Sequence, residues 1–531
     1  MGARWRATTV VLALALGGVG AADAHANPDQ QSIFMDDNLL LYRGGEVSDR
    51  TLDELKDLGV DRVRISVHWR AIAPGLHAAV KPASLGNGTD SSRYPRRNFD
   101  IYDHVLRAAA RRGITVLANV TGGAPLWATG LLNGRHVGLQ YKPSQREFGR
   151  FVEMLGKRYD GTRRDENQGR RTLPRVDTWS IWNEPNQAAL LQPQWERSPR
   201  TGGLVPAAPR VYRGLVRFMT SALLRTGHGG DTVLLGETAP RGVDRRGMKG
   251  SLRPIAFLDA LLCLDPLLAQ PTAGTPEQGC DFASRGPLQV TGYAHHPYSV
   301  VASPETPDPN PLDVTLADRD RLQAVLDVAA RGRRLPRDLP FWWTEFGWQT
   351  LPPDPVRGVS LQRQAEWIAR AEHATWADPR VVAHTQFLLR DDDPRREPGA
   401  SVKRRWGTYQ TGLTFAGSGR RKPSYEAYRL PFTAPAQIAT GQTARLWGFV
   451  RPGDNAVSQH VTIEFRPTGS VGFQRVKQLT VPNDRGYFET DVRPTATGEW
   501  RFAWEPPAAS GAEADTAPPT LRSRVVTVKV G

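Results

Sequence analysis

The chain has 531 residues, a length that exceeds one ordinary domain. Its formal net charge is +15, from 69 lysines and arginines against 54 acidic residues, but no nucleic-acid-binding motif accompanies the charge, so it does not indicate a nucleic-acid partner. Only two cysteines are present, without paired histidines nearby, which argues against a zinc site, and we expect neither a metal nor another cofactor.

The excess of arginine, which is scattered along the whole chain, has two interpretations. A basic protein can be held against an anionic cell-envelope polymer or an acidic polysaccharide. Dispersed arginine is also typical of an ordinary solvated surface, and composition does not decide between the two.

The N-terminus has the pattern of a secretory signal over residues 1–26. Arg4 and Arg6 precede an apolar stretch from Val10 to Val19, and Ala24-His25-Ala26 follows as a small-x-small cleavage site. An uncleaved anchor is the alternative, although the apolar stretch is shorter than a membrane span. No other uncharged run is long enough to cross a bilayer, so we expect a secreted, extracellular protein without stable membrane insertion.

Between residues 32 and 430, strand-like apolar runs alternate with helix patterns. A capping box at Ser144 opens one helix, Gly113 closes another, and further helices are expected near 51–58, 209–225, 316–330 and 361–377. Nearly all-apolar strands alternating with helices indicate a parallel sheet covered by helices, and eight such units favour a closed (β/α)8 TIM barrel. The eight strands are expected at 38–42, 62–67, 115–120, 178–182, 232–236, 290–294, 341–344 and 382–388.

Cys263 and Cys280 lie between the fifth and sixth predicted strands, 17 positions apart. In an exported chain the oxidising surroundings favour joining them. We therefore predict one disulfide that pins this excursion.

Two of the predicted strands end abruptly in a glutamate. Asn183-Glu184-Pro185 follows the fourth strand, and Thr344-Glu345-Phe346 ends the seventh. Two carboxylates placed this way suggest cleavage of a glycosidic bond, because a retaining glycosidase needs a proton donor and a nucleophile about 5 Å apart.

After Pro431 the apolar pattern changes to a period of two, which predicts a small all-β, Ig-like sandwich over residues 436–531. Residues 506–519 form a Pro-, Ala- and acid-rich loop within it. Trp447, Trp500 and Trp504 are either a stacking platform for sugar or part of the core of the sandwich.

The Trp182-Asn183-Glu184-Pro185 and Trp343-Thr344-Glu345-Phe346-Gly347 segments, in this order, resemble the glycoside hydrolases of clan A, which are retaining barrel enzymes. The resemblance covers residues 32 to 430 and is greatest to the cellulase-like families five and thirty-nine. It implies that Glu184 is the general acid/base and Glu345 the nucleophile.

The same resemblance assigns four substrate-binding residues. Asn183 matches the residue that bonds the 2-hydroxyl, Arg64 matches the second-strand arginine beside the nucleophile, and His296 and Tyr298 match a sixth-strand His-x-Tyr. We expect the arginine and the tyrosine to keep Glu345 ionised, and a nearby carboxylate to raise the pKa of Glu184. From the residues alone, Arg64 could instead be a structural ion-pair partner.

Trp343 and Trp406 are further candidates for substrate binding. With Trp127, Trp182 and Trp348 they either stack on sugar faces or belong to the core. The sequence departs from many clan members after the eighth strand, where residues 390–393 (Arg-Asp-Asp-Asp) stand in place of a tryptophan floor, and Trp406 is expected to take that place. These four residues either bind a charged or acetamido sugar or form a solvated acidic loop.

The sequence thus predicts a secreted retaining β-glycosidase that hydrolyses O-glycosyl bonds of a polysaccharide or oligosaccharide. A transglycosylase with the same residues and a non-catalytic glycan-binding barrel of the cell envelope are the alternatives. The sugar, the linkage and the choice between internal and terminal attack stay open.

Overall fold

The computed structural model describes residues 26–169, 171–453, 457–481, 483, 485–507 and 519–531. The predicted secretory signal and the greater part of the predicted Pro-, Ala- and acid-rich loop lie outside these residues.

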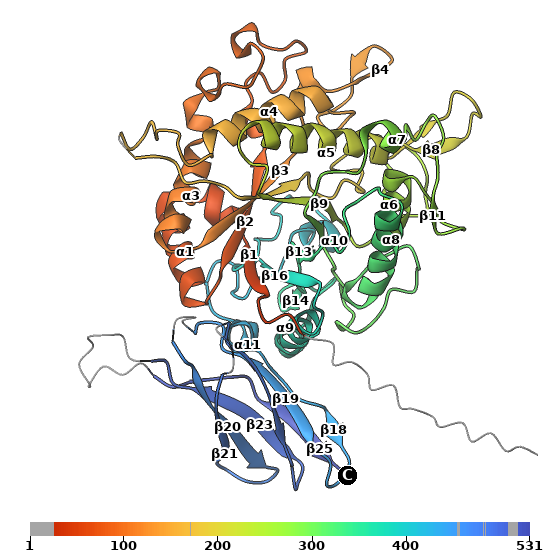
Figure 1. Cartoon of the computed structure of the whole chain (residues 1–531). Helices are drawn as coiled ribbons and strands as arrows, with labels where there is room; N and C mark the ends of the chain where they lie inside the picture. The colour runs from red at the N-terminus through yellow and green to blue at the C-terminus, as the bar shows by residue number, and fades with distance from the viewer. Residues whose placement is uncertain (1–25, 170, 454–456, 482, 484, 508–518) are drawn as a thin grey trace, which may run out of the picture.

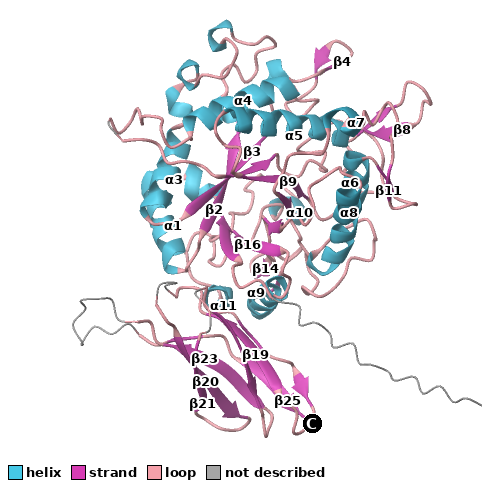
Figure 2. Ribbon diagram, viewed as in Figure 1, coloured by secondary structure: helices cyan, strands magenta, loops and turns pink. Residues whose placement is uncertain are grey.

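Eight parallel strands close into a barrel (Figures 1 and 2), which confirms the expected fold class. Around the barrel the strands follow the order β1-β16-β13-β12-β9-β6-β3-β2, and β1 pairs with both β2 and β16 to close it. Their bounds are β1 Gln31–Met35, β2 Arg62–His68, β3 Thr115–Thr121, β6 Thr178–Ile181, β9 Thr232–Thr238, β12 Gly292–His295, β13 Phe341–Trp343 and β16 Val381–Phe387.

Each barrel strand is followed by a helix that packs on the outside. The predicted cap of one of them is present, since the Ser144 hydroxyl accepts from the backbone N–H of Glu147 at 3.3 Å. The helices are α1 Gly45–Asp57, α3 Asp100–Arg111, α4 Gln145–Arg158, α5 Ala208–Arg225, α6 Pro254–Leu262, α8 Arg319–Arg331, α9 Leu361–Trp376 and α11 Pro423–Arg429. Shorter elements in the connections are α2 Trp69–Ile72, α7 Phe282–Arg285, α10 Val402–Arg405, β4 Leu131–Leu132, β5 Arg135–His136, β7 Trp195–Arg197, β8 Leu204–Pro206, β10 Leu264–Asp265, β11 Gln270–Pro271, β14 Thr350–Leu351 and β15 Val359–Ser360.

Seven of the eight predicted strands overlap the observed ones, and the first prediction is wrong. The first strand is β1, whereas the predicted strand at 38–42 is a single π-helical stretch, Asn38–Tyr42. Asp36 caps this stretch by accepting from the backbone N–H of Leu39 at 3.0 Å. A short buried apolar run is compatible with either a strand or a helix, and this run is too short to show whether its apolar residues follow the strand period of 2 or the helix period of 3.6.

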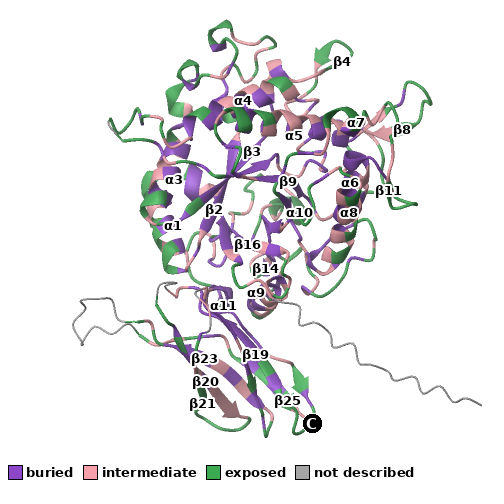
Figure 3. Ribbon diagram, viewed as in Figure 1, coloured by how far each residue is buried: buried purple, intermediate pink, exposed green. Residues whose placement is uncertain are grey.

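The core has two layers. The main hydrophobic cluster lies between the outer face of the barrel strands and the surrounding helices, while a small cluster that includes Leu117, Leu234 and Trp342 fills the inside of the barrel. Figure 3 shows the barrel strands buried and the outward faces of the helices exposed. Such a packed interior is a rigid support for side chains at the strand ends.

The C-terminal region forms two packed sheets (Figure 1). One has the order β17-β19-β22 and the other the order β18-β25-β23-β20-β21, with β24 also paired to β23. Trp500 and Trp504 are buried in the core of the sandwich, as one interpretation expected, whereas Trp447 is buried against the barrel, where it stacks on His373 of α9 with ring centroids 4.8 Å apart. The strand bounds are β17 Phe432–Thr433, β18 Gln437–Ile438, β19 Ala444–Phe449, β20 His460–Pro467, β21 Gln474–Thr480, β22 Tyr487–Val492, β23 Gly498–Trp504, β24 Leu521–Arg522 and β25 Val526–Val530.

This module packs against the barrel face where the strands begin. Arg451 of the module pairs with Glu372 near the end of α9 at 2.8 Å, and both side chains are almost fully buried. Arg485 pairs with Asp61, just before β2, at 2.8 Å. The module is therefore attached to the face opposite the carboxyl ends of the strands.

A disulfide joins Cys263 and Cys280, as predicted, in the connection between β9 and β12. Within the ranges given above, no helix is both long enough and apolar enough to cross a membrane.

Candidate active site

Glu184 and Glu345 line one pocket of about 500 Å³. Glu184 follows the end of β6 by three positions and Glu345 follows β13 by two. The carboxyl ends of the strands meet at one face of a (β/α)8 barrel, the face on which such barrels carry their active sites. Two segments 161 positions apart are thus brought to the same cavity.

His296, which follows β12, lies between the two carboxylates. Its Nδ1 is 2.9 Å from Oε1 of Glu184 and 3.6 Å from Oε2 of Glu345. One atom from each of the three side chains can be chosen so that all lie within 4.8 Å of one another. The two carboxylates are therefore close neighbours, with the imidazole ring beside both.

Glu345 is surrounded by hydrogen-bond donors. The Tyr298 hydroxyl donates to its Oε2 at 3.2 Å, and Nη1 of Arg64 lies 3.2 Å from its Oε1. Nη2 of Arg64 also donates to Oδ1 of Asn183 at 2.8 Å. The structure therefore brings together the two glutamates and all four residues that the clan A resemblance assigned.

A third glutamate, Glu237, was missed by the sequence reasoning. It follows Gly236 near the end of β9, is fully buried, and accepts from Nε and Nη2 of Arg64 at 3.0 and 2.5 Å. Asn119 and Ser180 also donate to it, at 2.6 and 2.8 Å. Its sequence signal was the same one that identified the other two, a glutamate at the end of an apolar strand.

The backbone at this face has left-handed residues that are not glycine. Trp182, Glu184 and Glu237 have φ angles of 63°, 40° and 46°. Such conformations cost on the order of 1–3 kcal/mol each and cluster at active sites and ligand clamps. The surrounding fold thus holds Glu184 and Glu237 in left-handed backbone conformations that residues other than glycine rarely adopt.

Burial raises the pKa of Glu345, while the positive charges of His296 and Arg64 lower it and the negative charges of Glu184 and Glu237 raise it further. The net direction is upward, because burial and the two neighbouring carboxylates outweigh the charges of His296 and Arg64. Burial lowers the pKa of His296, but the carboxylates of Glu345, Glu184 and Glu237 outweigh burial and raise it overall.

The walls of the pocket combine aromatic and polar side chains, including Phe387, Tyr409, Gln187, Gln349 and Arg357. A volume of this size is typical of a small-molecule site, in which apolar walls are combined with a few fixed polar groups.

The predicted tryptophans do not line this pocket. Trp343 is buried and stacks on Phe341 with ring centroids 5.3 Å apart, and Trp406 is the residue that caps α10. Trp182 and Trp348 are also buried, and they donate from their indole nitrogens to backbone carbonyls. The aromatic lining comes instead from Tyr298, Phe387 and Tyr409.

The Asp-rich segment after β16 is partly structural. Asp391 is buried and pairs with the buried ammonium of Lys422 at 2.7 Å, and the same ammonium donates to the Thr350 hydroxyl. Arg390 and Asp393 are exposed. Asp391 therefore neither binds sugar nor belongs to a solvated acidic loop, the two expectations for this segment. It instead joins two of the loops around the pocket.

Among the residues that the structure describes, Glu184, His296 and Glu345 form the one cluster with metal-ligand spacing. The nearest pair, His296 Nδ1 and Glu184 Oε1, is at hydrogen-bond distance, so the ring nitrogen already has a carboxylate partner.

No protein-family model and no curated protein matches this chain. Solved structures that are similar in fold include Fpglu1 from Fervidobacterium pennivoraus, with 13% identity, coverage of 77% of this chain and 95% of that one, and a TM-score of 0.42. A structure described as a glycoside hydrolase has 15% identity, covers 74% and 92% of the two chains, and has a TM-score of 0.36. An aphid myrosinase has 11% identity, covers 76% and 97%, and has a TM-score of 0.38. At these values the similarity carries no argument about activity, which has to come from the site.

Proposed function

We propose that this chain is a secreted retaining β-glycosidase, similar to families five and thirty-nine of clan A, which hydrolyses O-glycosyl bonds of a polysaccharide or oligosaccharide. The observation that carries the proposal is the short separation of the two carboxylates, which with His296 lie within 4.8 Å by their nearest atoms. Retaining enzymes hold their carboxyl groups about 5–5.5 Å apart, whereas inverting enzymes leave about 6.5–9.5 Å for a water molecule.

In the proposed first step, a carboxylate oxygen of Glu345 attacks the anomeric carbon while the bond to the leaving oxygen breaks. Glu184 gives its proton to that oxygen. In the second step, water attacks the anomeric carbon, its proton passes to Glu184, and the bond to Glu345 breaks.

The environments of the two groups support this division of roles. Glu345 is bonded by Tyr298 and Arg64, which hold its oxygens in place for attack. Glu184 is more exposed, at 21% of its side chain, and Nδ1 of His296 lies 2.9 Å from its Oε1. The imidazole of His296 is close to both carboxylates, so proton transfer at Glu184 can be coupled electrostatically to the charge of Glu345.

Alanine variants assayed on an activated aryl β-glycoside test the assignment. Glu345→Ala should abolish turnover even with an excellent leaving group, because no covalent intermediate forms. Glu184→Ala should spare the first step for such a substrate and slow hydrolysis of the intermediate.

Azide separates the roles by stereochemistry. With Glu184→Ala it should give the β-glycosyl azide, because the anion attacks the intermediate from the face that water uses. With Glu345→Ala it should give the α product. Product NMR that shows α azide from the Glu184 variant would reverse the roles, and inversion by the unmodified enzyme would refute the retaining mechanism.

A further inference from the structure

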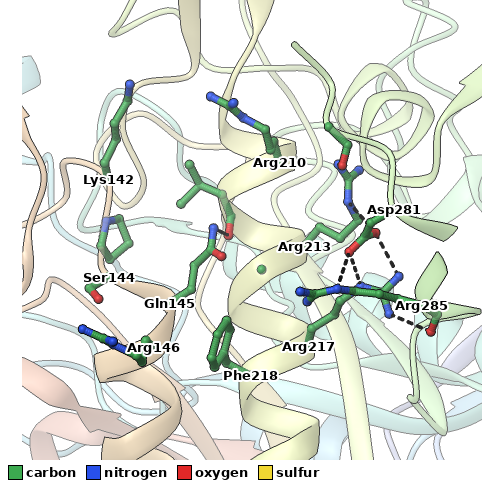
Figure 4. A pocket seen from close by; sticks show the side chains of 14 residues that line it. Lys142, Ser144, Gln145, Arg146, Arg210, Arg213, Arg217, Phe218, Asp281 and Arg285 are labelled. Atoms are coloured by element: carbon green, nitrogen blue, oxygen red, sulfur yellow. Dashed lines mark hydrogen bonds and ion pairs between the residues drawn. The ribbon is translucent and has the colours of Figure 1, made fainter. Parts of the chain in front are cut away.

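A basic groove of about 650 Å³ lies on the outer wall of the barrel, between α4 and α5 (Figure 4). Six cationic side chains line the basic groove: Lys142, Arg146, Arg210, Arg213, Arg217 and Arg285. The two helices approach closely at Gly149 on α4, where an added Cβ would lie 2.9 Å from Cβ and 3.2 Å from the backbone oxygen of Phe218 on α5. The groove is thus a feature of helix packing rather than a chance cluster of long side chains.

Negative charge in the basic groove is insufficient to balance the positive charge. Asp281 is shared by three arginines, and its oxygens lie 2.8 Å from Arg217, 3.5 Å from Arg213 and 3.8 Å from Arg285. Figure 4 shows this cluster at one side of the groove, with Lys142, Arg146 and Arg210 at the other.

On that second side one carboxylate serves two cations. Glu196 pairs with Lys142 at 2.9 Å and with Arg210 at 2.5 Å. Arg146 is exposed and has no ion pair with any residue that the structure describes. Two carboxylates therefore face six cations, and an anion that enters the groove would find unsatisfied positive charge.

The floor of the basic groove is fixed before any ligand binds. Arg213 is 2% exposed, and its guanidinium donates to the backbone carbonyls of Leu261 and Gly279, both at 2.7 Å. Burial lowers the pKa of Arg213 to about 10; Asp281 opposes this, while the charges of neighbouring arginines add to it. A bound anion would relieve this repulsion.

One chain excursion, residues 186–207, connects the basic groove with the candidate active site. Gln187 and Leu190 line the catalytic pocket, while Glu196 further along holds the cations of the groove. The backbone N–H of Lys142 donates to the carbonyl of Gln192 in the middle of the excursion, at 2.7 Å. The pocket itself contains Arg357, an exposed residue whose guanidinium has no hydrogen-bond or ion-pair partner among the described residues.

We propose that the basic groove binds the carboxylate groups of an acidic polysaccharide that extends from the catalytic pocket across this excursion; the inference rests on the proposed glycosidase function. Neutral sugars are bound largely by stacking on aromatic faces, but Phe218 is the one aromatic side chain that lines the groove. Guanidinium groups bind carboxylates through paired N–H donors, and the groove offers several of them over two helices. A chain that carries repeated carboxylates fits this surface better than a single small anion.

The test is a titration of polygalacturonate oligosaccharides into the full-length protein, with the fully methyl-esterified oligosaccharides as the neutral partner. The α-linkages of this polymer are not substrates of the proposed β-glycosidase, so it serves as an uncleaved carboxylate probe of the groove. The groove variant combines Lys142→Gln, Arg146→Gln and Arg210→Gln. The control variant removes three exposed cations of the C-terminal sandwich, by Arg475→Gln, Arg493→Gln and Lys529→Gln, and so has the same net charge. We expect the groove variant to bind polygalacturonate at least about tenfold more weakly, because clustered charge in a concave site concentrates an anionic ligand.

Unmodified protein and control variant should bind polygalacturonate alike, and neither should bind the methyl ester comparably. Equal losses in both variants would overturn the proposal, because binding would then follow overall charge. Tighter binding of a DNA duplex than of polygalacturonate at equal charge concentration would assign the groove to nucleic acid instead. The groove variant should keep its kcat on the aryl β-glycoside, and a failure of the unmodified protein to cleave any such glycoside would refute the catalytic proposal without affecting the titration.

Discussion

Glu237 gives the sharpest test of how the site sets the charge of its nucleophile. Its carboxylate takes two donors of Arg64, and Arg64 also lies against Glu345. Replacing Glu237 by glutamine keeps the size of the side chain and one acceptor oxygen but removes the negative charge. The positive charge of Arg64 would then act mainly on Glu345.

The magnitude follows from the geometry. Glu237 and Glu345 contact different nitrogens of one guanidinium. At an effective dielectric constant of about 20, two unit charges separated by roughly 7 Å interact by about 2 kcal/mol. The pKa of Glu345 should therefore fall when the negative charge of Glu237 is removed. Because Glu237 raises this pKa in the native site, the direction of the change is downward.

The assay is the pH dependence of kcat/KM on an aryl β-glycoside, whose acidic limb reports the carboxyl that must be ionised in the free enzyme. In Glu237→Gln we expect this limb to move to lower pH. The variant should also lose about 3–5 kcal/mol of stability, because it disrupts a buried ion pair.

Asp103→Asn is the matched control. Asp103 forms a buried ion pair with Arg158 at 2.5 Å. After the substitution Arg158 still has a second acidic partner, Glu166, just as Arg64 still has Glu345. The control should be destabilised to a similar extent with its acidic limb unchanged. A folded Glu237→Gln protein with an unmoved limb, or an equal shift in the control, would show that Glu237 does not govern the ionisation of the nucleophile.

Three further predictions concern the scaffold. Free-thiol labelling of the denatured, unreduced protein should detect no thiol, and removal of the Cys263–Cys280 bond by paired serine substitutions should cost about 3 kcal/mol in chemical denaturation. Arg451→Met should destabilise the protein by about 3–5 kcal/mol, because Glu372 stays buried without its ion-pair partner. The kcat on a small aryl glycoside should stay unchanged. Loss of kcat in the folded variant would show that the C-terminal module contributes to the active site. Burial raises the pKa of Asp36 to about 7, so between pH ~4 and 7 the folded state binds one proton more than the unfolded state. The contribution of Asp36 to stability therefore falls as the pH rises toward 7. Asp36→Asn should remove this trend, so that denaturation midpoints measured between pH 4 and 8 depend less on pH.

Periodicity in the sequence was sufficient for the barrel because most of its strands are buried on both faces and are bounded by clear helix signals. It failed at Leu39, Leu40 and Leu41, where three consecutive buried leucines follow two aspartates and an asparagine and form a helical turn. The capping bond from Asp36 to Leu39 is a local interaction that hydrophobicity alone does not reveal. The preceding strand, Gln31–Met35, is short and begins with two polar residues, so its apolar signal is weak.

The candidate site was predictable where one short segment carried its own signal, and less so where function depends on packing. Glu184 and Glu345 could be found from strand ends and motifs, whereas Trp343 adjoins the nucleophile in sequence and yet faces the core. Strict alternation would direct residues two positions apart to the same face, but β13 ends at Trp343, so this regularity does not extend to Glu345. Tyr409, which does line the pocket, comes from a loop whose path is fixed by the buried Asp391–Lys422 pair, a long-range contact that sequence reasoning did not anticipate.

The three glutamates explain why an arginine can lie so near a proposed nucleophile. If Arg64 acted with its full charge on Glu345, the carboxylate would be strongly stabilised and would be a correspondingly weak nucleophile. Glu237 holds the same guanidinium by two hydrogen bonds, so Arg64 positions Glu345 through geometry while much of its charge is already neutralised. In the proposed mechanism, Glu237 therefore acts as a positioning residue through Arg64. Because Glu237 offsets the charge of Arg64, the buried carboxylate of Glu345 stays nucleophilic, while hydrogen bonds from Tyr298 and Arg64 hold it in place.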